Sequence, residues 1–288
     1  EVPCPACGAA ASRVVLRAGD ARFVRCRSCR VVYQNPQPVF EDLQRRYSEA
    51  YFRYERENEE NFFRLMRLGL QDVEFERLTS GLPRPRRFLD VGCATGRLLE
   101  HMRDGDWEVR GVELCPQSVA YGRSHRGLDI FAGTLDQASY PDQFFDAIHF
   151  SHLIEHVPDP RGLLVEVRRI LAPAGHVVVV TPNIDGLQAR LFGSRWRSAI
   201  GDHLTLFSKT TLRHLLELTG FQSLRVVTWG GLAAGSVPGW LKRPADRLAK
   251  RWGFGDVVLI LARKTAEDSR RPRKAAEVRR GPAVTHRG

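Results

Sequence analysis

The stretch Phe88-Leu-Asp-Val-Gly-Cys-Ala-Thr-Gly-Arg-Leu-Leu-Glu100 holds an apolar run, a turn of small residues and the start of a helical pattern. The apolar run leads into Asp90, and Gly92, Ala94 and Gly96 then leave the backbone with little side-chain bulk. Apolar residues after the turn recur at helical spacing. A strand, turn and helix in this order bring free backbone N–H groups to the carboxyl edge of a sheet, where open α/β folds bind their ligands. The stretch therefore predicts an α/β fold with a ligand site at this turn.

The glycine spacing and a later acidic residue narrow the class of ligand. A dinucleotide fingerprint would place glycines at positions 92, 94 and 97, but Ala94 and Arg97 stand at two of them. The next apolar segment, 107–113, ends with Glu113, 21 positions after Gly92. An acidic side chain at the end of the second strand can accept hydrogen bonds from both hydroxyls of a ribose. The alternative is a solvated glutamate at a strand end.

The pattern Asp-x-Gly-x-Ala-x-Gly over residues 90–96 resembles the first motif of class I S-adenosylmethionine (SAM) methyltransferases. Segment 144–150 looks like the fourth strand of that family, and Ser151-His-Leu-Ile-Glu-His-Val-Pro-Asp-Pro160 resembles its EHV-DP block. The resemblance covers roughly residues 84–264. It implies a Rossmann-like seven-stranded class I methyltransferase sheet, SAM as the cofactor and an enzyme that transfers a methyl group.

The resemblance also assigns cofactor contacts to the ends of four predicted strands. The turn after the first strand, the acidic residue after the second, a segment after the third and the top of the fourth would face SAM. The implied cofactor-binding residues are Asp90, Gly92, Ala94, Gly96, Glu113, Leu114, Gly133, Thr134, Leu135 and Ser151.

Three histidines are candidates for a catalytic base. His152 and His156 follow the fourth strand, and in similar enzymes a histidine at the position of His203 faces the acceptor pocket. An oxygen or carbon acceptor must lose a proton, which an imidazole can take near neutral pH, and we place His203 first. The alternative is that Glu155-His156 orients the loop and that His203 is a packed, hydrogen-bonded residue. Relatives often carry Pro-Arg or Pro-Glu before this histidine, where this chain has Gly-Asp, so the acceptor contacts are expected to differ.

The first part of the chain has the spacing of a metal site. Two C-x2-C pairs, Cys4/Cys7 and Cys26/Cys29, are separated by 18 residues, as in a tetrahedral Cys4 zinc site. We expect structural zinc, because four protein ligands leave no position open for water. Two disulfides or a redox C-x-x-C are the alternatives. Segment 31–36, where the chain leaves the predicted ribbon, resembles the corresponding segment of zinc-ribbon methyltransferases of cell-surface glycan and natural-product pathways.

The domain organisation is predicted from these motifs and from prolines and changes in composition that mark segment boundaries. Segment 39–78 has a helical, amphipathic pattern with aromatic stripes, which are more often core than substrate contacts. Its Tyr47, Tyr51 and Tyr54 are candidates for lining the acceptor site. The predicted division is a Cys4 zinc ribbon at 1–35, a helical linker or lid at 36–83, a SAM-binding domain at 84–265 with insertions at 183–207 and 230–255, and a disordered basic tail at 266–288.

The basic composition does not by itself indicate a nucleic-acid substrate, although it allows a general affinity for polyanions. The chain of 288 residues has a net charge of +11, with 39 Arg against 5 Lys, a skew that indicates an Arg-favouring genome more than a binding face. Segment 269–288 holds seven Arg or Lys and one Glu, and so contributes +6 of this charge. We therefore expect a small-molecule acceptor and no specific nucleic-acid partner.

The cellular location is predicted from the lack of a transmembrane or signal-peptide pattern and from the arrangement of the cysteines. No run of about 18 apolar residues indicates a transmembrane helix, and the first residues lack the pattern of a signal peptide. The cysteine arrangement favours a reducing cytoplasm. Trp240 and Trp252 lie beside Lys and Arg, which suits either peripheral membrane contact or an ordinary connection packed on the domain.

Three classes of function compete. The favoured one is a SAM-dependent methyltransferase that acts on a sugar, glycan precursor or natural product by O- or C-methylation. The second is a methyltransferase acting on a macromolecule, RNA or protein, held by the ribbon and the basic tail. Segment 151–154 argues against it, because amino-group nucleic-acid methyltransferases carry an Asn/Asp-Pro-Pro-Tyr/Phe type of motif there. The third is a non-catalytic SAM-binding scaffold.

Overall fold

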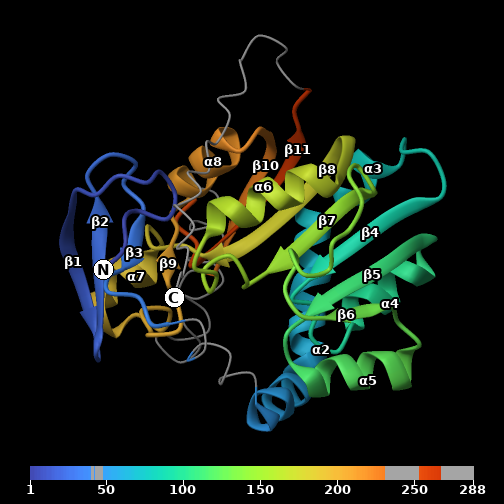
Figure 1. The fold of residues 1–288 in the computed structure, drawn as a ribbon, viewed down its shortest axis with the longest axis horizontal. Helices are drawn as coiled ribbons and strands as arrows, with labels where there is room; N and C mark the ends of the chain where they lie inside the picture. Colours follow the sequence, from blue (N-terminus) through green and yellow to red (C-terminus); the bar gives the residue numbers. More distant parts are fainter. Residues whose placement is uncertain (40–41, 43–47, 231–252, 267–288) are drawn as a thin grey trace, which may run out of the picture.

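The computed structural model describes residues 1–39, 42, 48–230 and 253–266, which form two sheets and their helices (Figure 1). The larger sheet has seven strands in the order β10-β11-β8-β7-β4-β5-β6. Its strands are β4 (Arg86–Val91), β5 (Trp107–Glu113), β6 (Ile130–Ala132), β7 (Phe145–Ser151), β8 (Leu171–Pro182), β10 (Phe221–Trp229) and β11 (Val257–Lys264).

The larger sheet is parallel from β6 to β8, and β11 runs antiparallel to both β8 and β10. The strand order reverses between β4 and β7, and open α/β sheets bind ligands at the carboxyl ends of the strands beside such a switch point. The prediction of a Rossmann-like, seven-stranded sheet is confirmed.

Helices cover both faces of this sheet, because its strands carry apolar residues in unbroken runs. Within β8, Val177 and Val179 belong to one buried cluster, and Val178 and Val180 to another. The first cluster includes side chains of α6 (Pro160–Ile170) and α8 (Lys209–Leu218). The second includes side chains of α2 (Glu49–Asp72), α3 (Phe75–Thr79), α4 (Arg97–Asp104) and α5 (Pro116–Arg126).

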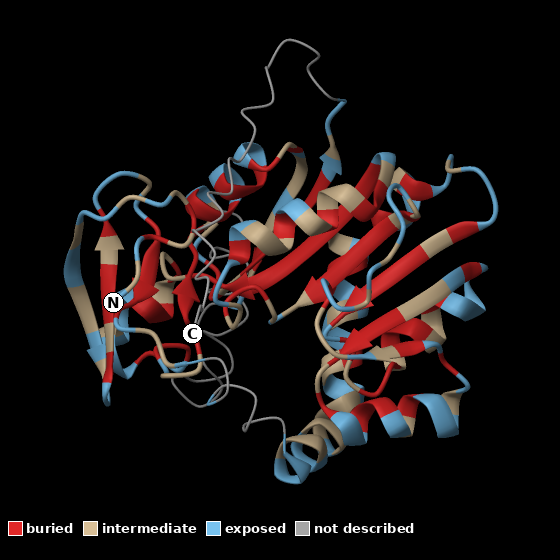
Figure 2. Ribbon diagram, viewed as in Figure 1, coloured by how far each residue is buried: buried red, intermediate tan, exposed pale blue. Residues whose placement is uncertain are grey.

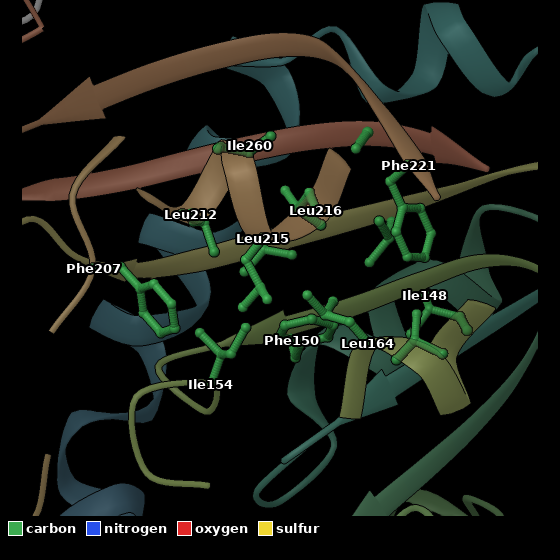
Figure 3. Packing of buried hydrophobic residues seen from close by; sticks show 14 of the residues in the cluster. Ile148, Phe150, Ile154, Leu164, Phe207, Leu212, Leu215, Leu216, Phe221 and Ile260 are labelled. Atoms are coloured by element: carbon green, nitrogen blue, oxygen red, sulfur yellow. The ribbon is translucent and has the colours of Figure 1, made fainter. Parts of the chain in front are cut away.

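The packing of α8 shows how one amphipathic helix seals the sheet. Figure 3 shows Leu212, Leu215 and Leu216 pointing toward the sheet, where Phe150 and Ile260 lie. Ser208 begins the helix, since its side chain accepts the Thr211 N–H at 3.2 Å, and the positive φ of Gly220 ends it. Figure 2 shows that the central strands of the sheet are mostly buried, whereas the helices beside them carry exposed residues.

The smaller sheet joins the first strands of the chain to a strand from its second half. Its order is β1 (Ser12–Ala18), β2 (Ala21–Cys26), β3 (Val32–Gln34) and β9 (Thr205–Leu206). The segment before β9 holds α7 (Leu187–Phe192) and the short 3-10 helix η1 (Gly193–Arg195). Figure 1 shows β9 and α7 beside the first three strands.

The predicted helical segment 39–78 is not one continuous helix in the structure. The long helical segment is divided at Glu74, which has a positive φ, into α2 and α3. Predictions for Tyr47, for most of the 230–255 insertion and for nearly all of the basic tail lie outside the described residues. Among the helices that the structure describes, none is long and apolar enough to span a membrane.

Candidate functional site

The turn after β4 has the backbone shape that a phosphate- or cofactor-binding loop requires. Gly92, Ala94 and Gly96 all have positive φ, which is unusual for Ala94 because it carries a Cβ. A Cβ on Gly96 would lie 2.3 Å from the Leu128 side chain, so this turn packs as closely as a glycine allows. The first N–H groups of the loop donate to the Val112 carbonyl, which ties the loop to β5.

Glu113, at the end of β5, lies directly against this loop. One carboxylate oxygen accepts the Ala94 N–H at 2.9 Å and the other accepts the Cys115 N–H at 2.8 Å. Burial raises the pKa of Glu113, although these backbone hydrogen bonds oppose the rise. Each carboxylate oxygen has a second lone pair, so the side chain can still accept hydrogen bonds from two ribose hydroxyls.

The other predicted cofactor residues lie along the same sheet edge. Leu114 follows Glu113, and Gly133 donates its N–H to the Glu113 carbonyl at 2.9 Å. Thr134 and Leu135 come next after β6, and Ser151 ends β7. The structure therefore brings the loop, Glu113 and these residues to the ends of adjacent parallel strands, while their contacts with SAM stay a prediction.

Asp90 faces a partner that the sequence analysis did not name. Its carboxylate accepts a hydrogen bond from His149 Nδ1 at 2.7 Å, and both side chains are buried in the sheet. Burial raises the pKa of Asp90, and His149 opposes this rise. A histidine within the apolar strand 144–150 was the available signal for a buried partner. Asp90 therefore supports the loop through β7, and a direct contact with cofactor stays a prediction.

Helix α2 adds two carboxylates to this site. Glu59 accepts a hydrogen bond from Thr95 in the glycine loop and from Arg126 Nη2 at 2.8 Å. Glu55, one turn earlier, accepts from Ser118 Oγ at 3.2 Å. Burial and the neighbouring charge of Glu113 raise the pKa of Glu55 to about 7. Neither residue was predicted from the sequence, and their spacing of four on one helix face was the available signal.

The three predicted catalytic histidines gather around one buried carboxylate beyond the end of β7. His152 Nδ1 donates to the Glu155 carboxylate at 3.1 Å, and Thr181 Oγ1 donates to its other oxygen at 2.8 Å. The rings of His156 and His203 lie 4.7 Å apart, edge to face. The structure thus brings together residues separated by about 50 positions in the sequence, which spacing alone could not establish.

The hydrogen bonds of the histidines settle which ring nitrogen carries the proton. His203 Nδ1 lies 2.7 Å from the Ser198 carbonyl oxygen, and His156 Nδ1 lies 2.9 Å from the Asp202 carbonyl oxygen. A carbonyl only accepts, so both Nδ1 atoms carry hydrogen and both Nε2 atoms keep a free lone pair. Burial lowers the pKa of His203, which favours the neutral ring.

Glu155 is the charged centre of this cluster. Burial alone would raise its pKa, but the hydrogen bond from His152 and the proximity of the three imidazoles lower it to about 2. Glu155, His156 and His203 each offer a donor atom within 4.8 Å of the other two. Such a cluster can share a proton or hold a cation, and the sequence analysis gave Glu155 only a loop-orienting role.

The four cysteines of the first segment form a second cluster. Cys4 Sγ and Cys29 Sγ lie 3.5 Å apart, Cys7 Sγ and Cys26 Sγ lie 3.6 Å apart, and all four lie within 4.8 Å of one another. Four sulfurs about 2.3 Å from one zinc ion would lie about 3.8 Å apart. None of the six cysteines, all within the described residues, is in a disulfide. The donor set therefore fits zinc.

Two knuckles shape the cysteine cluster. Gly8 and Arg30, each directly after the second cysteine of a pair, have positive φ and turn the chain back. Backbone N–H groups donate to the sulfurs of Cys4, Cys7 and Cys29. Such hydrogen bonds stabilise thiolates, the form that binds a metal.

Comparison with known proteins identifies the larger fold. Residues 59–226, more than half of the chain, match the family model of a methyltransferase domain. The chain belongs to this methyltransferase family. It is a class I SAM-dependent methyltransferase domain, and SAM is the cofactor of this class. The glycine loop and Glu113 are compatible with that cofactor.

Relatives and solved structures agree with this family. The methyltransferase is 33% identical over 104 residues to a ubiquinone biosynthesis O-methyltransferase of Alkalilimnicola ehrlichii, covering 34% of this chain and 42% of the relative. It is 31% identical over 122 residues to the Xanthomonas axonopodis protein of the same name, covering 40% and 51%. The chain thus spans about half of the length of these curated relatives.

The solved structures show the fold alone, because their sequence identities are low. A SAM-dependent methyltransferase of Thermotoga maritima aligns with a TM-score of 0.55 and 23% identity, over 75% of this chain and 98% of its own. The cyclase SpnF aligns with a TM-score of 0.51 and 21% identity, over 71% and 81%. The same fold therefore occurs in a protein named for other chemistry, and the reaction must be argued from the site.

Proposed function

We propose that this methyltransferase transfers the methyl group of SAM to a small-molecule acceptor, a sugar, glycan precursor or natural product, by O- or C-methylation. One observation carries the proposal: Glu113 and the glycine loop after β4 lie together at the sheet edge where a ribose would bind, and an imidazole cluster lies beyond the end of β7, the strand next to β4. The relatives named O-methyltransferases favour an oxygen acceptor.

The chain's own residues would position the cofactor. Glu113 would accept hydrogen bonds from the ribose hydroxyls of SAM. The loop would approach the other polar groups of SAM at Gly92, because glycine has no side chain. Gly133, Thr134 and Leu135 would contact the adenine through the segment after β6. When bound, SAM supplies an activated methyl group, so the protein has mainly to align the acceptor and exclude water.

His203 is the proposed base at the acceptor. Its Nδ1 hydrogen is held by the Ser198 carbonyl, so Nε2 is free to take a proton from an acceptor hydroxyl or acidic carbon. The anionic Glu155 nearby stabilises the imidazolium that then forms. The alternative bases are His156, whose ring packs against the ring of His203, and His152, which donates a hydrogen bond to the Glu155 carboxylate.

The proposed architecture keeps the division at 1–35, 36–83, 84–265 and 266–288. The first segment would be a structural zinc ribbon, in which zinc would cross-link two knuckles that have little core of their own. Segment 36–83 would cover the cofactor, which agrees with the contacts of Glu59 and Glu55. A cytoplasmic location remains part of the proposal.

Methyl-labelled SAM tests the function. The pure protein would be incubated with labelled SAM and an extract of the source cell, which is then partitioned into organic, aqueous and macromolecular fractions. Label in a small-molecule fraction is expected. Label only in the macromolecular fraction would favour RNA or protein as the acceptor, and cofactor binding without transfer to any fraction would favour a scaffold.

The role of His203 has its own test once an acceptor is in hand. His203→Ala should lower kcat about 10²–10⁴-fold, the contribution of a general base, and leave the Kd for SAM nearly unchanged. His214→Ala, which removes an exposed imidazole on α8, is the matched control. Full turnover by His203→Ala at saturating substrate would remove His203 from this role.

A further inference from the structure

The cysteine segment is joined to the acceptor side of the methyltransferase by backbone pairing. β3 pairs antiparallel with β9, with Val32 opposite Leu206 and Tyr33 opposite Thr205. One residue further along, Gln34 N–H donates to the Leu204 carbonyl at 2.8 Å. His203, the proposed base, is the residue directly before this paired segment.

The segment after His203 is bonded on both of its sides. On one side it is held by β3, and on the other the N–H groups of Leu204 and Thr205 donate to the Glu155 carbonyl at 2.7 and 3.1 Å. The side chain of Glu155 is the centre of the imidazole cluster. β9 therefore lies between the cysteine segment and the residues that would act on the acceptor.

Side chains reinforce this pairing on both faces of the small sheet. On one face, Cys4, Cys26 and Tyr33 belong to the same buried cluster as Ile154 and Phe207. On the other face, Val32 and Phe23 belong to a cluster with Leu206, Ala199 and the fully buried Trp196. The cysteine segment thus completes its core with residues of the 183–207 insertion, which carries His203.

The cofactor residues are held by other parts of the chain. The glycine loop bonds to β5 through the Val112 carbonyl and to Glu113, and α2 bonds to Thr95. Among the hydrogen bonds of the described residues, none joins the segment 90–96 to residues 1–35. The hydrogen bonds that hold the two halves of the site are therefore separate.

We propose that the cysteine ribbon is the positioning element for His203: with metal on its four cysteines, β3 holds β9 and so fixes the imidazole at the acceptor. This inference rests on the proposed function, because it takes His203 as an acceptor-side residue. The Gln34 N–H is the critical contact. Loss of the metal or of this N–H should reduce turnover and leave cofactor affinity intact.

Gln34→Pro in the full chain tests this contact, since proline removes the N–H that donates to Leu204. In an antiparallel ladder the N–H and C=O of one residue point to the same side, so pairing between β3 and β2 is preserved. Gln34→Ala, which keeps the N–H and loses the side chain, is the matched control. Zinc content should be the same in all three proteins.

Three measurements separate positioning from general damage. Amide hydrogen exchange should show loss of protection at Leu206, which lies opposite Val32 of β3, in Gln34→Pro, and normal protection across β4 and β5. The Kd for SAM should change less than about twofold, while kcat falls about 10–100-fold, the scale expected for a misplaced catalytic group. Removal of metal by a chelator should reproduce these changes, and added zinc should reverse them.

Other outcomes overturn the inference. Retained kcat and retained amide protection in both Gln34→Pro and the chelated protein would show that His203 does not depend on the ribbon. Equal losses of SAM affinity and turnover would show that the ribbon supports the whole fold rather than the acceptor side. If the intact protein transfers no methyl group at all, the proposed function fails, but hydrogen exchange and SAM affinity still decide whether the ribbon holds β9.

Discussion

Glu113 and Glu155 are both buried glutamates at the same edge of the sheet, yet their surroundings shift their pKa values in opposite directions. Burial dominates at Glu113 and raises its pKa, although three backbone N–H groups oppose the rise. At Glu155 burial acts in the same direction, but His152 and the other imidazoles outweigh it. One carboxylate is thus shaped to accept hydrogen bonds, and the other to balance positive charge on imidazoles.

Glu113→Gln tests the cofactor edge at the scale of one residue. The charge-assisted hydrogen bonds to a ribose would be replaced by weaker ones from an amide, so the Kd for SAM should rise about 10–100-fold, on the order of 1.5–3 kcal/mol. Isothermal titration calorimetry with SAM checks this. Glu108→Gln, exposed on the same strand, should bind normally. Unchanged affinity of Glu113→Gln would show that Glu113 only supports the loop.

At the scale of elements, α2 packs against the glycine loop and α5 through the partly buried carboxylates of Glu59 and Glu55. Glu59 is held by Thr95 and Arg126, and its pKa is lowered because these hydrogen bonds outweigh its burial. Glu55 has no basic partner among its described contacts and is close enough to Glu113 to feel its charge. The docking of α2 is therefore expected to depend on pH through Glu55.

The sign of this pH dependence follows from the raised pKa. Burial and the charge of Glu113 raise the pKa of Glu55 from 4.5 to about 7, so the folded state binds its proton more tightly than the unfolded state. The stability from this proton is present below pH 4.5 and is lost as the pH rises through about 7. Glu55→Gln should thus be about 1–3 kcal/mol more stable than the natural protein at pH 8, and nearly equal to it at pH 4.5.

Urea unfolding of the cofactor-free protein at the two pH values measures this difference. Glu57→Gln, an exposed position on the same helix, is the control and should show little difference at either pH. The same stability difference at pH 4.5 and pH 8 would mean that Glu55 titrates normally.

At the scale of the whole molecule, the smaller sheet joins the methyltransferase fold at β9, beside the cluster of Glu155, His156 and His203. The larger sheet has extensive helical cover on both faces, whereas the smaller one relies on its cysteines and on the 183–207 insertion. A small segment without a full core needs a cross-link of some kind, and the four thiols at metal-ligand spacing fit a zinc cross-link.

Metal analysis of protein never exposed to chelator should therefore find about one zinc per chain. Cys29→Ser should lose this zinc and increase proteolysis within residues 1–35, because a serine hydroxyl is a poor zinc ligand. Cys93→Ser replaces a cysteine outside the cluster and should keep the zinc. Protein that contains no zinc but has the same protease resistance would contradict the cross-link.

The sequence by itself determined the larger fold and its cofactor edge, because these depend on local patterns. The apolar run before Asp90, the small-residue turn and the strand ending at Glu113 are contiguous, and parallel strands bring their carboxyl ends to one edge whatever the loops do. The two C-x2-C pairs likewise predict their own cluster. In each case a short stretch of sequence contains both the functional side chains and the local pattern that predicts where they lie in the fold.

Only the tertiary structure decided how the surroundings of His203 and Glu113 are built. Pairing of β3 with β9, the meeting of His203 with Glu155, and the docking of Glu55 near Glu113 each join segments far apart in the chain. No local periodicity specifies such contacts, because they depend on how an insertion and a helix close onto an already formed sheet. The pKa shifts of Glu55, Glu113 and Glu155 follow from that closure, since burial and neighbouring charges exist only once the chain is folded.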